Sequence, residues 1–170
     1  MAQEFRTVEP ARGSGFQSVA VLVGFLALTL GVGIFAGLVT EPNVLTWYPT
    51  LAKPSFNPPN WVFAPVWTTL YVLMAVAGWR VWRITDFDSR ALLFWVAQLV
   101  LNFAWSFIFF GAHEIGLALI EIAILWLTVL ATMLMFFRID RIAGWLFVPY
   151  LAWVSFAAAL NASIHLLNPG

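Results

Sequence analysis

The sequence contains no cysteine, few charged residues and only two histidines. Without cysteine there is no disulfide bond, no thiolate metal ligand, no cysteine nucleophile and no cysteine-ligated haem. Charged residues make up 9% of the chain, against about 25% in an average soluble domain. The formal net charge is zero, so charge gives no reason to expect nucleic acid as a partner. The sequence also lacks an HExxH motif, a P-loop and any metal-ligand cluster, so no motif indicates a soluble enzyme or a bound metal.

Hydrophobic residues, in contrast, make up 62% of the chain and occur in five long runs. About 20 apolar residues at 1.5 Å per residue span a bilayer core. We therefore expect an all-α integral membrane protein, a bundle of five transmembrane helices forming one domain over residues 18–166 after a flexible polar tail, residues 1–17. The expected spans are residues 18–39, 61–83, 90–110, 116–137 and 142–166. Short connections predict that the second to fifth helices are consecutive antiparallel neighbours.

The long connection between the first two spans is rich in proline and aromatic residues. Five of the nine prolines fall between Pro42 and Pro59. Because proline fixes φ and lacks a backbone donor, we expect residues 40–60 to be stiff and not helical. A long connection in a compact protein is often functional, and this one is interpreted as a lid over a ligand site. In the preceding span, Gly33 and Gly37 form a GxxxG pattern, which indicates either a helix contact or the usual glycine content of membrane helices.

Basic residues are distributed unequally between the two sides of the predicted bundle. One side has only Lys53, whereas the other has seven arginines. These are Arg6, Arg12, Arg80, Arg83, Arg90, Arg138 and Arg141. In a bacterial inner membrane, this bias predicts a cytoplasmic N-terminus, with the long loop and the C-terminus on the opposite side.

Polar residues within the spans are candidates for function. Gln98, Asn102 and Trp105 share one face of the third helix at spacings of four and three residues. They would either face a ligand or bridge helices, and spacing alone favours bridging. Glu121 lies less than two turns into the fourth helix, where it would be either a proton site or ligand partner, or a residue close enough to the interface to stay hydrated. We favour the interpretation that it is hydrated or hydrogen-bonded.

Two aromatic stripes follow helical spacing. Trp67 and Tyr71 form the first, and Tyr150, Trp153 and Ala157 form the second. Spacing alone favours packing over a ligand site for both stripes.

Neither histidine is placed for deep haem ligation, because His113 lies in a turn and His165 near the end of the chain. An iron porphyrin would need Tyr48, Tyr71 or Tyr150 as its axial ligand, or would have none. Metal-free porphyrin needs no such ligand, and no cofactor is required.

Several linked motifs, spread over residues 18–166, closely resemble those of the TspO/MBR family, also called translocator proteins, tryptophan-rich sensory proteins or peripheral-type benzodiazepine receptors. They are Trp47-Tyr48, Lys53-Pro54, Pro58-Pro59, Trp61, Pro65-Val66-Trp67-Thr68, Leu70-Tyr71, Gln98-Leu99, Leu101-Asn102-Phe103, Trp105, Phe109-Phe110-Gly111, Pro149-Tyr150-Leu151-Ala152-Trp153 and Leu160-Asn161.

The resemblance implies a five-helix receptor or sensor, often a homodimer, that binds tetrapyrroles such as protoporphyrin IX and haem in a pocket closed by the first loop. The resemblance also implies that the two aromatic stripes line this pocket. The implied ligand-binding residues are Tyr48, Pro58, Trp67, Tyr71, Asn102, Trp105, Trp153, Ala157 and Leu160.

Two other activities remain open at this stage. The resemblance allows a light-dependent porphyrin-degrading enzyme, in which Trp67 and Trp153 would be catalytic, or a transporter of porphyrins and other lipophilic molecules. Cholesterol binding is doubtful, because Ala162 stands where the sterol motif of animal members requires tyrosine and no basic residue follows.

Overall fold

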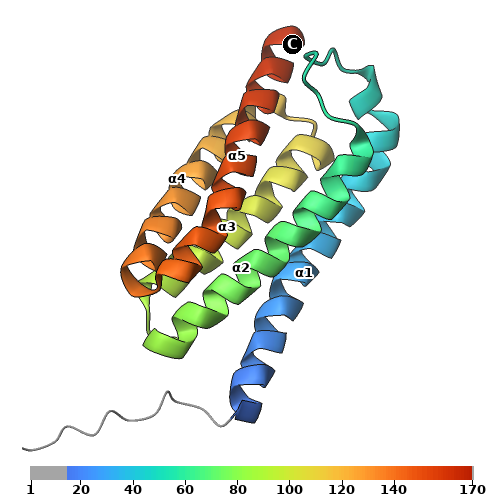
Figure 1. Cartoon of the computed structure of the whole chain (residues 1–170). Helices are drawn as coiled ribbons and strands as arrows, with labels where there is room; N and C mark the ends of the chain where they lie inside the picture. The colour runs from blue at the N-terminus through green and yellow to red at the C-terminus, as the bar shows by residue number, and fades with distance from the viewer. Residues whose placement is uncertain (1–14, 170) are drawn as a thin grey trace, which may run out of the picture.

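The computed structural model describes residues 15–169, in which all regular structure is helical. Its five long helices are each long and apolar enough to cross a membrane, which confirms the predicted all-α bundle (Figure 1). They are α1 (Gly15–Thr46), α2 (Phe63–Thr85), α3 (Arg90–Ser106), α4 (Ile115–Ile139) and α5 (Arg141–Leu167). Short 3-10 turns cover Tyr48–Thr50 and Asn60–Val62, and a π-helical turn, Phe107–Gly111, continues α3. Of the predicted tail, residues 1–14 lie outside the described residues, and residues 15–17 already belong to α1.

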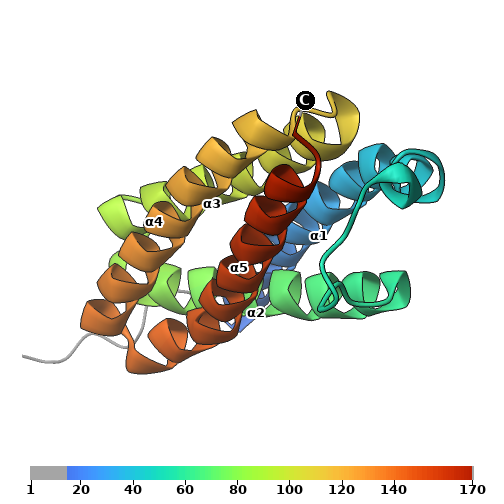
Figure 2. The same ribbon diagram turned by 90° about the horizontal axis from the view of Figure 1, so that it is seen from above.

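The helices form a ring in the order α1, α2, α5, α4, α3, with α3 closing against α1 (Figure 2). The prediction that consecutive helices are neighbours is therefore right for α3, α4 and α5 but wrong for α2 and α3. These two are joined by a short turn, yet α2 packs mainly between α1 and α5. A short connection brings only the connected ends of two helices together. Along the rest of their length, α2 and α3 contact each other through side chains that reach across the interior.

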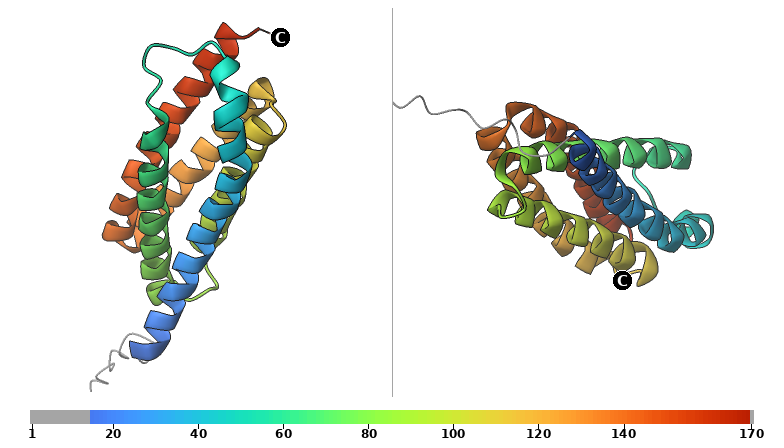
Figure 3. Two further views of the ribbon diagram at one scale, coloured as in Figure 1. Left: turned by 90° about the vertical axis from the view of Figure 1, so that its right-hand side faces the viewer. Right: turned by 90° about the horizontal axis from the view of Figure 1, so that it is seen from below.

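The two ends of the bundle differ in charge and in structure. At one end, here called the arginine end, α2 and α4 finish and α3 and α5 begin. Its described basic residues are Arg80, Arg83, Arg90, Arg138 and Arg141. The other end carries the first loop (residues 47–59) and the end of α5, and is here called the loop end (Figure 3).

Side-chain caps fix the helix starts at the arginine end. The Ser89 hydroxyl accepts a hydrogen bond from the Ala91 amide at 3.3 Å and caps α3. Asp140 caps α5 in the same way through the Ile142 amide, and it also accepts a 2.5 Å bond from Arg80 Nε. Burial raises the pKa of Asp140, but the bonds from Arg80 and from backbone amides outweigh it and hold that pKa below its usual value. The ionised Asp140 carboxylate therefore joins the α4–α5 turn to Arg80 of α2.

The first helix is longer than predicted, because it continues through Pro42 to Thr46. Side chains supply donors around the proline. The Asn43 amide donates to the Val39 carbonyl at 2.9 Å, and the Thr46 hydroxyl donates to the Pro42 carbonyl at 2.7 Å. A single proline removes only one helical hydrogen bond, so the helix survives here. The non-helical connection is thus shorter than the predicted 40–60.

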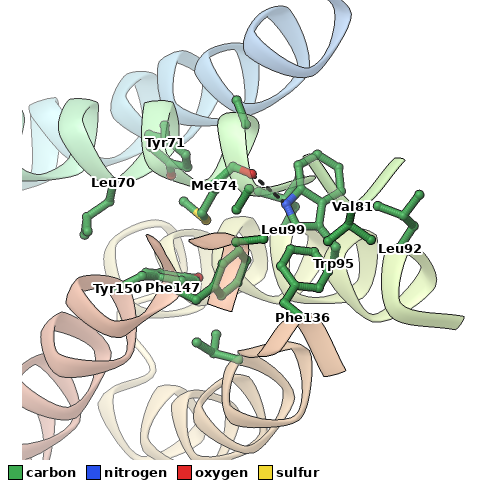
Figure 4. Close-up of a cluster of buried hydrophobic side chains, with 14 of the residues drawn as sticks. Leu70, Tyr71, Met74, Val81, Leu92, Trp95, Leu99, Phe136, Phe147 and Tyr150 are labelled. Carbon is green, nitrogen blue, oxygen red and sulfur yellow. Dashed lines mark hydrogen bonds between the residues drawn. The ribbon is translucent and has the colours of Figure 1, made fainter. Parts of the chain in front are cut away.

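The core toward the arginine end is built around Trp95, which is 1% exposed. Its indole N–H donates to the Met74 carbonyl of α2 at 2.9 Å (Figure 4). Gly78 lets this indole approach, because a Cβ there would lie 2.8 Å from both Trp95 and Phe25. This packing joins α1, α2 and α3.

The two glycines of the GxxxG pattern have different surroundings. A Cβ on Gly33 would lie 2.5 Å from the Tyr71 ring of α2, so Gly33 is a helix contact. A Cβ on Gly37 would meet nothing within 4 Å. The pattern therefore marks one contact and not a continuous glycine face.

Gly33→Ala is expected to destabilise the protein by about 1–3 kcal/mol, because the new methyl group would displace the buried Tyr71 ring. Thermal unfolding in detergent measures the change. Gly37→Ala is the matched control, because it gains the same helix propensity as Gly33→Ala but its new methyl group contacts nothing. This variant should unfold at or above the wild-type temperature. Equal unfolding temperatures for the two variants would contradict the assignment of Gly33 as the contact.

Candidate ligand-binding site

The first loop is held down across the loop end of the bundle. Asn168, just after α5, exchanges two hydrogen bonds with the Ala52 backbone, accepting from its amide and donating to its carbonyl at 2.9 Å each. Tyr48 is 5% exposed and packs with Phe109 and Leu160 in a hydrophobic cluster. The loop is therefore an integral part of the packed structure.

Hydrogen bonds within the loop maintain its shape. Lys53 Nζ donates to the carbonyls of Tyr48 and Leu51, at 2.8 Å each, and lies 5.0 Å from the centre of the Tyr48 ring. The Tyr48 hydroxyl donates to Asn57 Oδ1 at 2.6 Å, and burial raises its pKa to about 12. Tyr48 thus remains a hydrogen-bond donor at neutral pH.

A second attachment joins the start of the loop to the α3–α4 turn. The Trp47 indole stacks on the His113 ring with centroids 4.1 Å apart and planes 13° from parallel. His113 Nε2 donates in turn to Asn43 Oδ1 at 2.8 Å. Both interactions lie at the surface, as the prediction of a turn histidine implies.

Below the loop, aromatic rings of α2 and α5 form a wall. Trp67 stacks on Tyr71 with centroids 5.6 Å apart. The same indole meets Tyr150 edge-on at 6.3 Å and stands perpendicular to Trp153 at 6.5 Å. The two stripes predicted from helical spacing therefore meet each other in the bundle.

Asn102 lies behind this wall and joins three helices. The Tyr71 hydroxyl donates to Asn102 Oδ1 at 2.7 Å, and Asn102 Nδ2 donates to the Tyr150 hydroxyl at 3.4 Å. Asn102 is 3% exposed, so these bonds replace water for all three groups. Asn102 has the bridging role that spacing favoured. Gln98, one turn away, donates only to the Trp95 carbonyl of its own helix.

Trp105 makes the corresponding link nearer the loop end. Its indole N–H donates to Asn161 Oδ1 of α5 at 3.1 Å. Asn161 Nδ2 donates onward to the Ile115 carbonyl of α4 at 3.0 Å. Three helices are again joined through one amide side chain.

The predicted site residues divide between two hydrophobic clusters. The cluster toward the arginine end, called the inner cluster, includes Tyr71 and packs against Trp67, Trp153 and Ala157. The outer cluster contains Tyr48 and Leu160. Trp105 packs against both, so it marks the seam between them. Pro58 belongs to neither cluster, and its carbonyl accepts a 3.3 Å bond from the Asn57 side chain within the loop.

The structure also contains a groove of about 590 Å³ between α2 and α5 that the sequence did not reveal. Its lining includes Trp153 and, apart from Thr69, consists of apolar residues. The lining residues are Pro65, Val66, Thr69, Leu70, Leu73, Pro149, Ala152 and Trp153. The sequence does show that Pro65, Thr69 and Leu73 lie at helical spacing on one face of α2. It does not show that α2 pairs with α5, so the groove could not be predicted.

Glu121 corrects another expectation. It is 7% exposed, and neither carboxyl oxygen has a hydrogen-bond partner among the described residues. The preferred interpretation of a hydrated or hydrogen-bonded residue is therefore wrong. Position along the helix suggested access to water, but packing of α4 against α3 and α5 buries the side chain. No group of three or more histidine, aspartate and glutamate side chains in residues 15–169 is arranged to hold a metal ion.

Comparison with known proteins identifies relatives across most of the chain. Protein CrtK of Rhodobacter capsulatus is 43% identical over 137 residues, covering 79% of this chain and 84% of that protein. Tryptophan-rich protein TspO of Chlorobaculum tepidum is 42% identical over 158 residues, covering 90% and 99%. The human translocator protein is 38% identical over 153 residues, covering 87% and 90%.

The family model described as the TspO/MBR family matches residues 25–167. This range includes all of α2 to α5, the first loop and most of α1. It also includes every predicted site residue. The chain is therefore an integral membrane protein that belongs to the TspO/MBR family.

Proposed function

We propose that this protein is a membrane receptor or sensor that binds tetrapyrroles, such as protoporphyrin IX or haem, beneath the first loop. Its membership of the TspO/MBR family supports the broader role of a membrane sensor, receptor or transporter. The observation that carries the finer proposal is the convergence of the Trp67, Tyr71 and Trp153 rings under a closed loop. Flat aromatic faces suit a flat, apolar macrocycle.

Ligand entry requires that the two clusters separate at their seam. Met74 and Tyr150 are fully buried, so the interior is filled by side chains. The Ala52–Asn168 bonds and the Trp47–His113 stack are the contacts that opening would break first, because they lie at the surface. Asn102 could then exchange one of its bonds to tyrosine for a bond to a polar edge of the macrocycle.

Metal-free porphyrin fits this site better than a ligated haem does. His113 and His165 are exposed at the loop end, away from the aromatic wall. Tyr71 and Tyr150 are engaged with Asn102, and Tyr48 with Asn57. A haem would therefore bind without a histidine ligand, held mainly by contacts to its face.

Trp67→Ala and Trp153→Ala are each expected to weaken protoporphyrin IX binding about tenfold, because loss of one aromatic contact costs ~1.5 kcal/mol. Quenching of tryptophan fluorescence in detergent, titrated in the dark, measures the dissociation constant. Trp61→Ala is the matched control, since Trp61 is 75% exposed, and it should change the signal amplitude but not the midpoint. The proposed function fails if wild-type protein shows no saturable quenching, and the assigned site fails if all three variants retain wild-type affinity.

A second candidate function is light-dependent oxidative breakdown of the bound porphyrin. The stacked Trp67–Tyr71 pair next to the perpendicular Trp153 forms a continuous series of oxidisable rings. Such rings could supply electrons while the pigment and dioxygen provide the chemistry.

Under illumination, the wild-type complex is expected to lose porphyrin absorbance faster than free pigment in the same detergent. Trp67→Phe should slow this loss to the rate of free pigment, because phenylalanine retains the ring but is much harder to oxidise. Trp145→Phe is the control, since Trp145 is 63% exposed. An unchanged rate in Trp67→Phe would exclude Trp67 as the electron donor.

We also propose that the arginine end lies in the cytoplasm and the loop end on the opposite side. Five of the described arginines lie at the arginine end, and Lys53 lies at the loop end. Basic residues near short loops set orientation in a bacterial inner membrane.

Because the chain has no native cysteine, single substitutions can report this orientation. In intact spheroplasts, a membrane-impermeant maleimide is expected to label Ser55→Cys in the first loop but not Asp88→Cys in the α2–α3 turn. Both positions are exposed. In inverted vesicles the pattern should reverse, and the opposite pattern in both preparations would mean that the orientation is inverted.

A further inference from the structure

Glu121 is a carboxyl group that the fold buries without a partner. It lies six residues into α4, about 9 Å along the helix axis. Neither oxygen has a hydrogen-bond partner among the described residues, and the residue is 7% exposed. An unsatisfied polar group at membrane depth costs several kcal/mol, so a residue of this kind usually has a function.

The packing of α4 does not require a carboxyl group at this position. The other buried residues near Glu121 on this helix are apolar, including Ala118, Ile122 and Leu125. The next buried polar residue is Thr132, whose hydroxyl donates to the Thr128 carbonyl of the same helix at 2.8 Å. A leucine of similar size could fill the space of Glu121 without leaving a polar atom unpaired.

Glu121 lies at the seam between the inner and outer clusters. Ala118, one turn before it, belongs to the outer cluster, whereas Ile122 and Leu125 belong to the inner cluster. The inner cluster also contains Tyr150, which contacts Trp67 and Asn102. It therefore borders the volume that a ligand would occupy after separating the clusters.

No polar side chain of the described interior is hydrogen-bonded to Glu121. Tyr71, Asn102 and Asn161 are already engaged with other partners. Across the ring, α3 carries no titratable side chain between Arg90 and its end, and the titratable side chains of α5 are Arg141 at its start, Tyr150, and His165 near its end. Every described lysine and arginine lies in the first loop or at the arginine end. A molecule that enters the site would supply the missing donor.

We propose that Glu121 recognises a nitrogen-bound hydrogen on the ligand. Two ligand sources share this chemistry: the inner pyrrole N–H groups of a metal-free tetrapyrrole, and the ammonium group of an aromatic amine. A ligand with only acceptor groups would leave the carboxyl unpaired and would bind less well. The inference rests on the proposed function in placing the ligand at the same site.

The test compares ligands that differ only in the donor. The first pair is protoporphyrin IX and its nickel complex, which has the same periphery but no inner N–H. The second pair is 1-naphthylmethylamine and 1-methylnaphthalene. Affinity for the porphyrins is measured by fluorescence quenching, and binding of the naphthalenes by the rise in unfolding temperature of full-length protein in detergent.

Glu121→Leu is expected to weaken binding of one donor-bearing ligand by about tenfold or more, and to leave its donor-free partner within about twofold. The pair that responds identifies the ligand source. Thr132→Val is the matched control, because it removes a buried but self-satisfied polar group from the same helix, and it should affect neither pair. If Glu121→Leu reduces both members of each pair equally, or neither, the proposal is overturned.

The unfolding temperature of the protein without ligand distinguishes a role of Glu121 in binding from a structural role. If Glu121 serves binding, Glu121→Leu should unfold at a higher temperature than wild type, because the substitution removes an unpaired buried carboxyl. A lower unfolding temperature together with equal effects on both ligands would make Glu121 a structural residue. Failure of wild type to bind either porphyrin would instead contradict the proposed function, and the amine pair would still test Glu121.

Discussion

The constraint on which the rest of this structure depends is that polar side chains inside a membrane are costly unless they find partners within the protein. Asn102 meets it by joining Tyr71 of α2 to Tyr150 of α5, and Asn161 meets it by joining Trp105 of α3 to the α4 backbone. Between lipid-exposed helices there is little hydrophobic driving force, so such bonds and close packing determine which helices are adjacent. Asn102 also bonds both tyrosines that contact Trp67 of the aromatic wall. The site and the fold are thus specified by shared residues.

The existence of the helices and their approximate ends could be predicted from sequence, because length, hydropathy and caps are local properties. The predicted starts of the third and fifth spans, residues 90 and 142, agree with the structure within one residue, and Ser89 and Asp140 cap these helices. The end of α1 could not be predicted, since a proline removes only one helical hydrogen bond and a helix can either end or continue there, as α1 does through Pro42. The ring order was also hidden, because pairing α2 with α5 depends on contacts between segments distant in sequence.

The candidate site was predicted in a similarly uneven way. Helical spacing identified the stripes containing Trp67 and Trp153, and the family resemblance gave them a role, but only the fold shows that these rings meet. Glu121 was misjudged because its distance from the helix end says nothing about which face is covered. A residue that fits its surroundings poorly is easier to recognise in three dimensions than in sequence. Here the misfit is a buried carboxyl group with no hydrogen-bond partner among the described residues.

The attachment of the loop to Asn168 bears on the rate at which a ligand would exchange, and not only on its affinity. The Ala52–Asn168 bonds join the loop to the end of the last helix, so the two must separate before a molecule beneath them can leave toward the loop end. These bonds contact no predicted ligand-binding residue directly. For a ligand bound as proposed, they would act mainly on the height of the barrier to exchange, and much less on the depth of the bound state. Its residence time would then depend in part on Asn168, at a distance from the aromatic rings proposed to hold it.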